Sequence, residues 1–118
     1  MDLLELFARQ EAYQKQMGYE FPEPNIEACK QYIQALNVEQ VELLNELPWK
    51  PWRNYDAKEF SKQRQIDEWT DSLIFLVNEA LALQFSPTEV ELAIERVFQK
   101  NYSRILNGIS KLKGNETL

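Results

Sequence analysis

Histidine is absent from this chain of 118 residues, and only one cysteine, Cys29, is present. The absence of histidine excludes Ser-His-Asp and Cys-His catalysis and zinc sites built on imidazole. It also argues against a di-iron carboxylate bundle, because such bundles normally need Glu-x-x-His pairs. A single cysteine cannot form an intrachain disulfide, so we expect a cytoplasmic setting and interpret Cys29 as a small core residue.

The chain also has little glycine, with three residues, and lacks an apolar run long enough to span a bilayer. Its first residues are too charged for a signal peptide, so we expect neither a leader nor a membrane partner. The formal net charge is −6, which argues against a nucleic-acid partner because duplex-binding domains present a basic face. An apolar fraction of 44% favours one folded domain over disorder.

The five prolines separate four segments with helical periodicity, and no alternating strand pattern is found. The first three predicted helices run over about 2–17, 25–47 and 56–84. The fourth opens at Ser86, continues through Leu106 and weakens at Gly108, and Asn25 and Ser86 are the predicted N-caps of the second and fourth. On the third helix the predicted core stripe contains Phe60, Ile66, Trp69, Leu73, Leu76, Val77 and Ala80. The fold class is therefore all-α and four-helix bundle-like. Residues 1–113 form the predicted domain, 114–118 a frayed tail, and oligomerisation is expected to complete so small a core.

Two acidic pairs lie on the second and third predicted helices, Glu39 with Glu42 and Glu68 with Asp71. Residues three apart share a helix face, so each pair places two carboxylates side by side. Apolar residues flank both pairs, and charge next to a buried segment is costly unless it is compensated. If the two helices pack together, the four carboxylates meet and suit a hard cation such as Mg²⁺, with Glu46 as a further ligand or an orienting group. The alternative is that these acids line solvated helix faces.

Basic and aromatic residues follow the first acidic pair, since residues 48–53 have the sequence Pro-Trp-Lys-Pro-Trp-Arg. A second basic set, Lys100 and Arg104, lies on the fourth predicted helix. Carboxylates that hold Mg²⁺ and cations that hold phosphate oxygens are the two halves of a triphosphate site. Surface solubility is the alternative role of these cations. Trp49 and Trp52 are expected to cap the bundle end, to form a pocket wall, or both.

These motifs resemble those of a known superfamily. Residues 38–53 are similar to the E-x-x-E-L…W-K-x-W-K motif of dimeric, all-α dUTPases, and residues 68–75 are similar to their E-x-x-D…F motif. More broadly, the chain resembles the all-α nucleoside triphosphate pyrophosphohydrolases, which include MazG-like proteins, over about residues 8–104. The resemblance implies Mg²⁺ as the cofactor. It implies as metal ligands Glu39, Glu42, Glu68 and Asp71.

The same resemblance implies further site residues. The implied phosphate-binding residues are Lys50, Lys100 and Arg104. The implied substrate-binding residues are Gln10, Gln14, Trp49, Trp52 and Asn101, with Gln14 standing where dUTPases carry Asn. Dimeric dUTPases are nearly twice as long as this chain, whose size is more similar to that of compact MazG-like proteins. The implied assembly is therefore a homodimer or homotetramer.

The expected function is hydrolysis of a nucleoside triphosphate to the monophosphate and pyrophosphate, with Glu39 or Glu42 accepting a proton from the attacking water. The resemblance favours dUTP as the substrate and a role in housecleaning of the nucleotide pool. A MazG-like hydrolase of another nucleotide, such as dCTP, is one alternative. A non-catalytic helical module that uses its acidic face to bind a basic partner is another.

Overall fold

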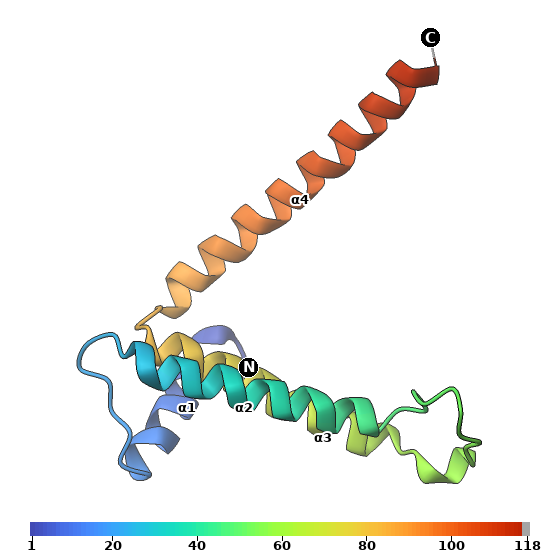
Figure 1. The fold of residues 1–118 in the computed structure, drawn as a ribbon. Coiled ribbons are helices and arrows are strands. Elements are labelled where there is room, and N and C mark those ends of the chain that lie inside the picture. The colour runs from blue at the N-terminus through green and yellow to red at the C-terminus, as the bar shows by residue number, and fades with distance from the viewer. Residues whose placement is uncertain (117–118) are drawn as a thin grey trace. The chain divides into compact units, whose positions relative to one another are not determined.

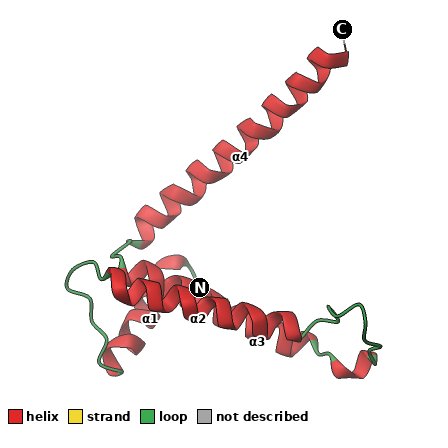
Figure 2. Cartoon of the chain, viewed as in Figure 1, coloured by secondary structure: helices red, strands yellow, loops and turns green. Residues whose placement is uncertain are grey.

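The computed structural model describes residues 1–116, and in this part the chain is all-α, with four α-helices and no strand (Figures 1 and 2). The helices are α1 (Leu3–Gln16), α2 (Ile26–Asn45), α3 (Lys62–Ala82) and α4 (Pro87–Glu116), with a 3₁₀ helix, η1 (Ala57–Glu59), before α3. The predicted fold class is confirmed. None of the helices in residues 1–116 combines the length and the apolar character needed to cross a membrane.

Side-chain caps set the starts of α2 and α4 where the sequence predicted them. Asn25 Oδ1 accepts a hydrogen bond of 2.9 Å from the backbone N–H of Ala28. Ser86 Oγ accepts one of 3.1 Å from the backbone N–H of Glu89 and donates one of 3.1 Å to Glu89 Oε1. These bonds satisfy N–H groups that have no partner within the helix. Both predicted N-caps are confirmed.

The predicted start of the third helix near Asp56 is wrong. Asp56 instead caps the short helix η1, where its carboxylate accepts a hydrogen bond of 3.0 Å from the backbone N–H of Lys58. Glu59 completes a capping box with Asp56, and Phe60 is extended. Ser61 then caps α3, which begins at Lys62. Two capping groups within six residues favour two separate helix starts over one continuous helix.

The chain divides into two compact units, Met1–Phe85 and a second that begins at Ser86 and contains α4. Helix α4 continues past Gly108, where the sequence pattern weakened, to Glu116. Of the predicted tail 114–118, residues 117–118 lie outside the described residues. The domain boundary at 113 stays a prediction.

Helices α2 and α3 form an antiparallel pair in the first unit, and α1 packs against α3 (Figure 1). At one end of the pair, the backbone N–H of Asn25 donates a hydrogen bond of 2.7 Å to the carbonyl of Ala82. Near the middle, Gln40 Nε2 donates one of 2.7 Å to Ser72 Oγ. This arrangement places the two predicted acidic pairs on facing helices.

The first unit has a thin apolar core. Its buried apolar residues are Phe7, Cys29, Val77, Ala80 and Ala82. The interpretation of Cys29 as a core residue is confirmed, and so are the last two residues of the predicted α3 stripe. The rest of that stripe is partly wrong, because Ile66, Trp69 and Leu76 are 47%, 55% and 49% exposed. Their face of α3 is not covered by the packing of α1 and α2.

Candidate metal centre

Three carboxylates converge where α2 faces α3. One oxygen from each of Glu39, Glu42 and Glu68 lies within 4.8 Å of the other two. Glu39 and Glu42 lie about one helical turn apart, so both side chains project from the same face of α2. Glu68 reaches them from α3. Glu39 and Glu68 are partly buried, whereas Glu42 is exposed. The cluster is therefore partly covered by protein at Glu39 and Glu68 and open to solvent at Glu42.

Two oxygens of this cluster have no hydrogen-bond partner. Glu39 Oε2 and Glu68 Oε2 are both buried from solvent, and neither accepts a hydrogen bond within the described residues. A buried carboxylate oxygen without a partner is unfavourable, because it has lost its water and gained nothing in return. A divalent cation takes oxygen ligands and satisfies carboxylate oxygens of this kind. The residues present thus fit a bound Mg²⁺.

The electrostatics of the cluster agree with this geometry. Burial, and then the neighbouring Glu42, raise the pKa of Glu39 above its ordinary value. Burial, and then Glu42, also raise the pKa of Glu68. Both shifts mean that the anionic form is disfavoured while only other acids stand nearby. A bound cation would favour the anionic forms of both carboxylates and lower their pKa values.

Asp71, the fourth predicted ligand, stands at the edge of the cluster. It is exposed and does not share the 4.8 Å grouping of the other three acids. Its charge still contributes to the raised pKa values of Glu39 and Glu68. The structure therefore brings three of the four predicted ligands together and leaves Asp71 close beside them.

Glu46 extends the acidic cluster by one turn of α2 but has a cationic partner. Arg64 Nε donates a hydrogen bond of 2.9 Å to Glu46 Oε2. The charge of Glu46 also contributes to the raised pKa of Glu68, so the two carboxylates influence each other. Glu46 is thus part of the electrostatic environment of the cluster, with its own charge compensated by Arg64.

The Trp-Lys-Pro-Trp hairpin leaves both indole rings accessible. Trp49 and Trp52 are in edge contact, with ring centroids 5.9 Å apart, and are 40% and 74% exposed. Trp49 Nε1 donates a hydrogen bond of 3.1 Å to Asn45 Oδ1, which ties the ring to the end of α2. Within this chain the two rings are not buried under the bundle end, so the capping interpretation is wrong for Trp52.

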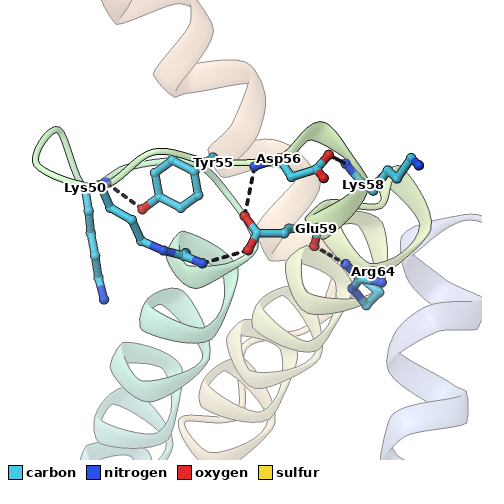
Figure 3. Close-up of polar contacts among 7 residues, drawn as sticks. Lys50, Tyr55, Asp56, Lys58, Glu59 and Arg64 are labelled. Carbon is cyan, nitrogen blue, oxygen red and sulfur yellow. Dashed lines mark hydrogen bonds and ion pairs between the residues drawn. The ribbon is translucent and has the colours of Figure 1, made fainter.

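The loop that carries the hairpin is held by its own polar contacts (Figure 3). The backbone N–H of Lys50 donates a hydrogen bond of 3.0 Å to Tyr55 Oη, and the Lys50 ammonium lies 5.7 Å from the centroid of Trp49. Arg53 pairs with Glu59 at 2.7 Å and stacks over Tyr55. These contacts give the predicted phosphate ligand Lys50 a fixed backbone position.

Gln10 and Gln14, the predicted substrate-binding amides, are buried on α1. Gln10 Nε2 donates a hydrogen bond of 2.8 Å to Asn78 Oδ1, and Gln14 Nε2 donates one of 3.2 Å to Tyr32 Oη. Tyr32 also lies next to Phe75, with ring centroids 6.4 Å apart. The amides are therefore oriented by contacts to α2 and α3.

The remaining predicted site residues lie on α4. Lys100, Asn101 and Arg104 are exposed, and Arg104 follows each of the other two by about one helical turn. Their role in phosphate and substrate binding stays a prediction.

A comparison with models of protein families gives one match that decides the family. A model described as dUTPase matches residues 2–116, which is nearly the whole chain. The chain belongs to the dUTPase family. Searches of curated proteins and of solved structures gave no match. Family membership supports a nucleotide hydrolase similar to dUTPases, and it agrees with the acidic motifs on α2 and α3.

The sequence pattern did not single out three polar residues: Asn78, Tyr32 and Glu79. Asn78 and Tyr32 hold the two glutamine amides, and Glu79 has a buried carboxylate oxygen, Oε2, without a hydrogen-bond partner. A signal was present for two of them. Asn78 and Glu79 are polar residues inside the apolar run 73–83, where an unpaired polar group is costly.

Proposed function

We propose that this protein is a Mg²⁺-dependent dUTP pyrophosphohydrolase that converts dUTP to dUMP and pyrophosphate. The observation that carries the proposal is the cluster of Glu39, Glu42 and Glu68, whose oxygens converge within 4.8 Å in a chain that belongs to the dUTPase family. Two buried oxygens of that cluster lack a partner, as expected for ligands of an ion. The reaction would supply dUMP and, because it removes dUTP, would keep uracil out of DNA.

Mg²⁺ would be held by Glu39, Glu42 and Glu68, with Asp71 beside them. When bound, it supplies positive charge to phosphate oxygens and lowers the pKa of a coordinated water. The protein's own task is to hold a water in line with the α-phosphorus and to accept its proton. Glu39 or Glu42 is the proposed base, since both side chains belong to the cluster that would hold the ion.

The proposed reaction breaks one P–O bond and forms another. The water oxygen bonds to the α-phosphorus, and the bond from that phosphorus to the oxygen bridging the α- and β-phosphates breaks. The leaving group is pyrophosphate, and its negative charge requires cations. The proposed phosphate contacts are Lys50, Lys100 and Arg104. Their charge would stabilise the leaving group.

The base and sugar would be bound by amides and aromatic rings. Gln10 and Gln14 are proposed to contact the nucleoside, and Asn101 is proposed to contribute a further polar group. Two contacts support the role of the glutamines, since their hydrogen bonds to Asn78 and Tyr32 fix where each amide points. The exposed rings of Trp49 and Trp52 are proposed to cover the nucleotide once it is bound.

The proposed assembly is a homodimer or homotetramer. Its support is the large exposed apolar surface of the first unit, which includes Val38 and Val41 on α2 and Ile66, Trp69 and Leu76 on α3. Contiguous exposed apolar side chains mark interfaces, and a small core gains stability from a partner.

The test is a nucleotide panel with purified protein and Mg²⁺, in which pyrophosphate and orthophosphate are measured separately. We expect pyrophosphate from dUTP, no orthophosphate, and loss of the reaction when EDTA removes the metal. Faster pyrophosphate release from dCTP than from dUTP would refute dUTP as the preferred substrate but would still support the proposed pyrophosphohydrolase reaction. No release from any triphosphate by folded protein would refute the enzymatic proposal and favour a non-catalytic helical module.

A further inference from the structure

Five acids lie along the α2–α3 seam, and one of them forms an ion pair with an arginine. The five acids, called here the acidic stripe, are Glu39, Glu42, Glu46, Glu68 and Asp71. Among the ion pairs of the described residues, only that of Arg64 with Glu46 involves this stripe. Glu46 is also the residue that follows α2 directly, as its C-cap.

Arg64 and its neighbour Gln65 hold Glu46 at both its side chain and its backbone. Arg64 Nε donates a hydrogen bond of 2.9 Å to Glu46 Oε2, and Gln65 Nε2 donates one of 3.0 Å to the Glu46 carbonyl. A second nitrogen of the guanidinium is bonded too, since Arg64 Nη2 donates a hydrogen bond of 2.5 Å to the carbonyl of Glu59 (Figure 3). A planar guanidinium with two of its nitrogens bonded to different residues has a fixed orientation.

Without this restraint, Glu46 is placed to join the metal cluster. It lies four residues after Glu42, a spacing that puts the two carboxylates on one helix face. A freed Glu46 carboxylate would therefore add a ligand to a cluster that now offers three convergent acids.

The number of carboxylate ligands affects which divalent ion a site prefers. Mg²⁺ requires an octahedral shell at short distance and keeps several of its waters, so few protein carboxylates suit it. Ca²⁺ accepts six to eight oxygens in flexible geometry. An added carboxylate therefore favours Ca²⁺ more than Mg²⁺.

We infer that Arg64 is a positioning residue that holds Glu46 away from the metal cluster and thereby favours Mg²⁺ over Ca²⁺. The inference rests on the proposed metal site and adds to it the basis of its ion selectivity. Arg64 acts through Glu46 and touches neither the ion nor the substrate. The pair thus limits the coordinating acids to those that converge on the α2–α3 seam.

The experiment is isothermal titration of the full chain with Mg²⁺ and with Ca²⁺, for the wild type and for R64Q, E46Q and the double variant E46Q/R64Q. We expect R64Q to raise the ratio of Ca²⁺ to Mg²⁺ affinity by about tenfold. If R64Q acted only by removing a positive charge, the affinities for Mg²⁺ and Ca²⁺ would rise by the same factor, because both ions carry two charges. E46Q should leave the ratio unchanged, and the double variant should return it to the wild-type value.

R9Q is the matched control, since Arg9 forms a similar exposed pair of 2.8 Å with Glu5 on α1. It should leave the ratio unchanged. An unchanged ratio in R64Q would overturn the inference, and so would a lower ratio in E46Q, which would make Glu46 a ligand in the wild type. If R64Q does not fold, R64M takes its place, with the same expected rise in the ratio and the same outcome that would overturn the inference. A wild type that binds neither ion would refute the proposed metal site as well.

Discussion

Gln10 on α1 and Asn78 on α3 are joined by a buried hydrogen bond of 2.8 Å, from Gln10 Nε2 to Asn78 Oδ1. Both residues are largely excluded from solvent, with exposed fractions of 9% and 4%. This bond links α1 to α3, and the apolar core between the helices of this unit is small. It also orients the amide that we propose to face the nucleoside.

Replacing Asn78 by Leu should therefore destabilise the protein by about 1–3 kcal/mol, because the buried amide of Gln10 loses its partner. Urea unfolding, followed by circular dichroism, measures this loss. The double variant Q10L/N78L should recover most of the stability, since removing both polar partners leaves no unsatisfied group. Equal losses in the single and double variants would mean that the hydrogen bond does not account for the effect.

Glu68→Gln should lower both Mg²⁺ affinity and dUTP turnover by at least about 100-fold, because it removes an acid from the centre of the proposed site. Its melting temperature without metal should be unchanged or higher, since one of several mutually repelling carboxylates is lost. Titration calorimetry, pyrophosphate release from dUTP and thermal unfolding give the three readings. Glu27→Gln, on an exposed part of α2, is the control and should change none of them. A large loss of stability in metal-free E68Q would instead make Glu68 a structural acid.

Glu79 should make the protein less stable as the pH rises. Burial raises the pKa of its carboxyl above the ordinary value of 4.5. A group with a raised pKa in the folded state contributes its full stability below the unfolded pKa and loses it as the pH rises through the folded value. The free energy of unfolding should thus fall from about pH 4.5 upward, and Glu79→Gln should flatten this fall. Urea titrations at several pH values test it, and identical slopes for the two proteins would contradict it.

Trp69→Lys should reduce the size of the assembly. Trp69 lies on the exposed apolar stripe of α3 with Ile66 and Leu76, and a charge placed there cannot be buried in an interface without large cost. Sedimentation velocity should show a dimer or tetramer for the wild type and a smaller species for the variant. Thr70→Lys, next to it on α3, is the control and should keep the wild-type size. A monomeric wild type would refute the proposed assembly.

Much of the fold follows from local signals in the sequence. The caps at Asn25 and Ser86 are short-range features, and the structure confirms both. The predicted start of α3 failed because Asp56 and Ser61 are both good caps, and a pattern of apolar spacing does not show which one begins the longer helix. The predicted burial of Trp69 failed because periodicity identifies an apolar face without showing whether this chain itself covers it.

The candidate site was predictable to the extent that it is built from residues close in sequence. The spacing of Glu39 with Glu42 implied a shared face, and the pairing of α2 with α3 brings Glu68 to them. The partners Asn78 and Tyr32 were not predictable, because each depends on which residue faces it from another helix. The restraint of Glu46 by Arg64 likewise joins two helices across a loop, so single-helix spacing does not reveal it.

The central claim is that Glu39, Glu42 and Glu68 hold a catalytic Mg²⁺. A crystal structure grown with Mg²⁺ and a dUTP analogue that has an imido bridge between its α- and β-phosphates tests it most directly. We predict an octahedral ion about 2.0–2.1 Å from oxygens of these three residues and of the phosphates. An analogue bound elsewhere, or three carboxylates turned to solvent with no ion between them, would contradict the claim.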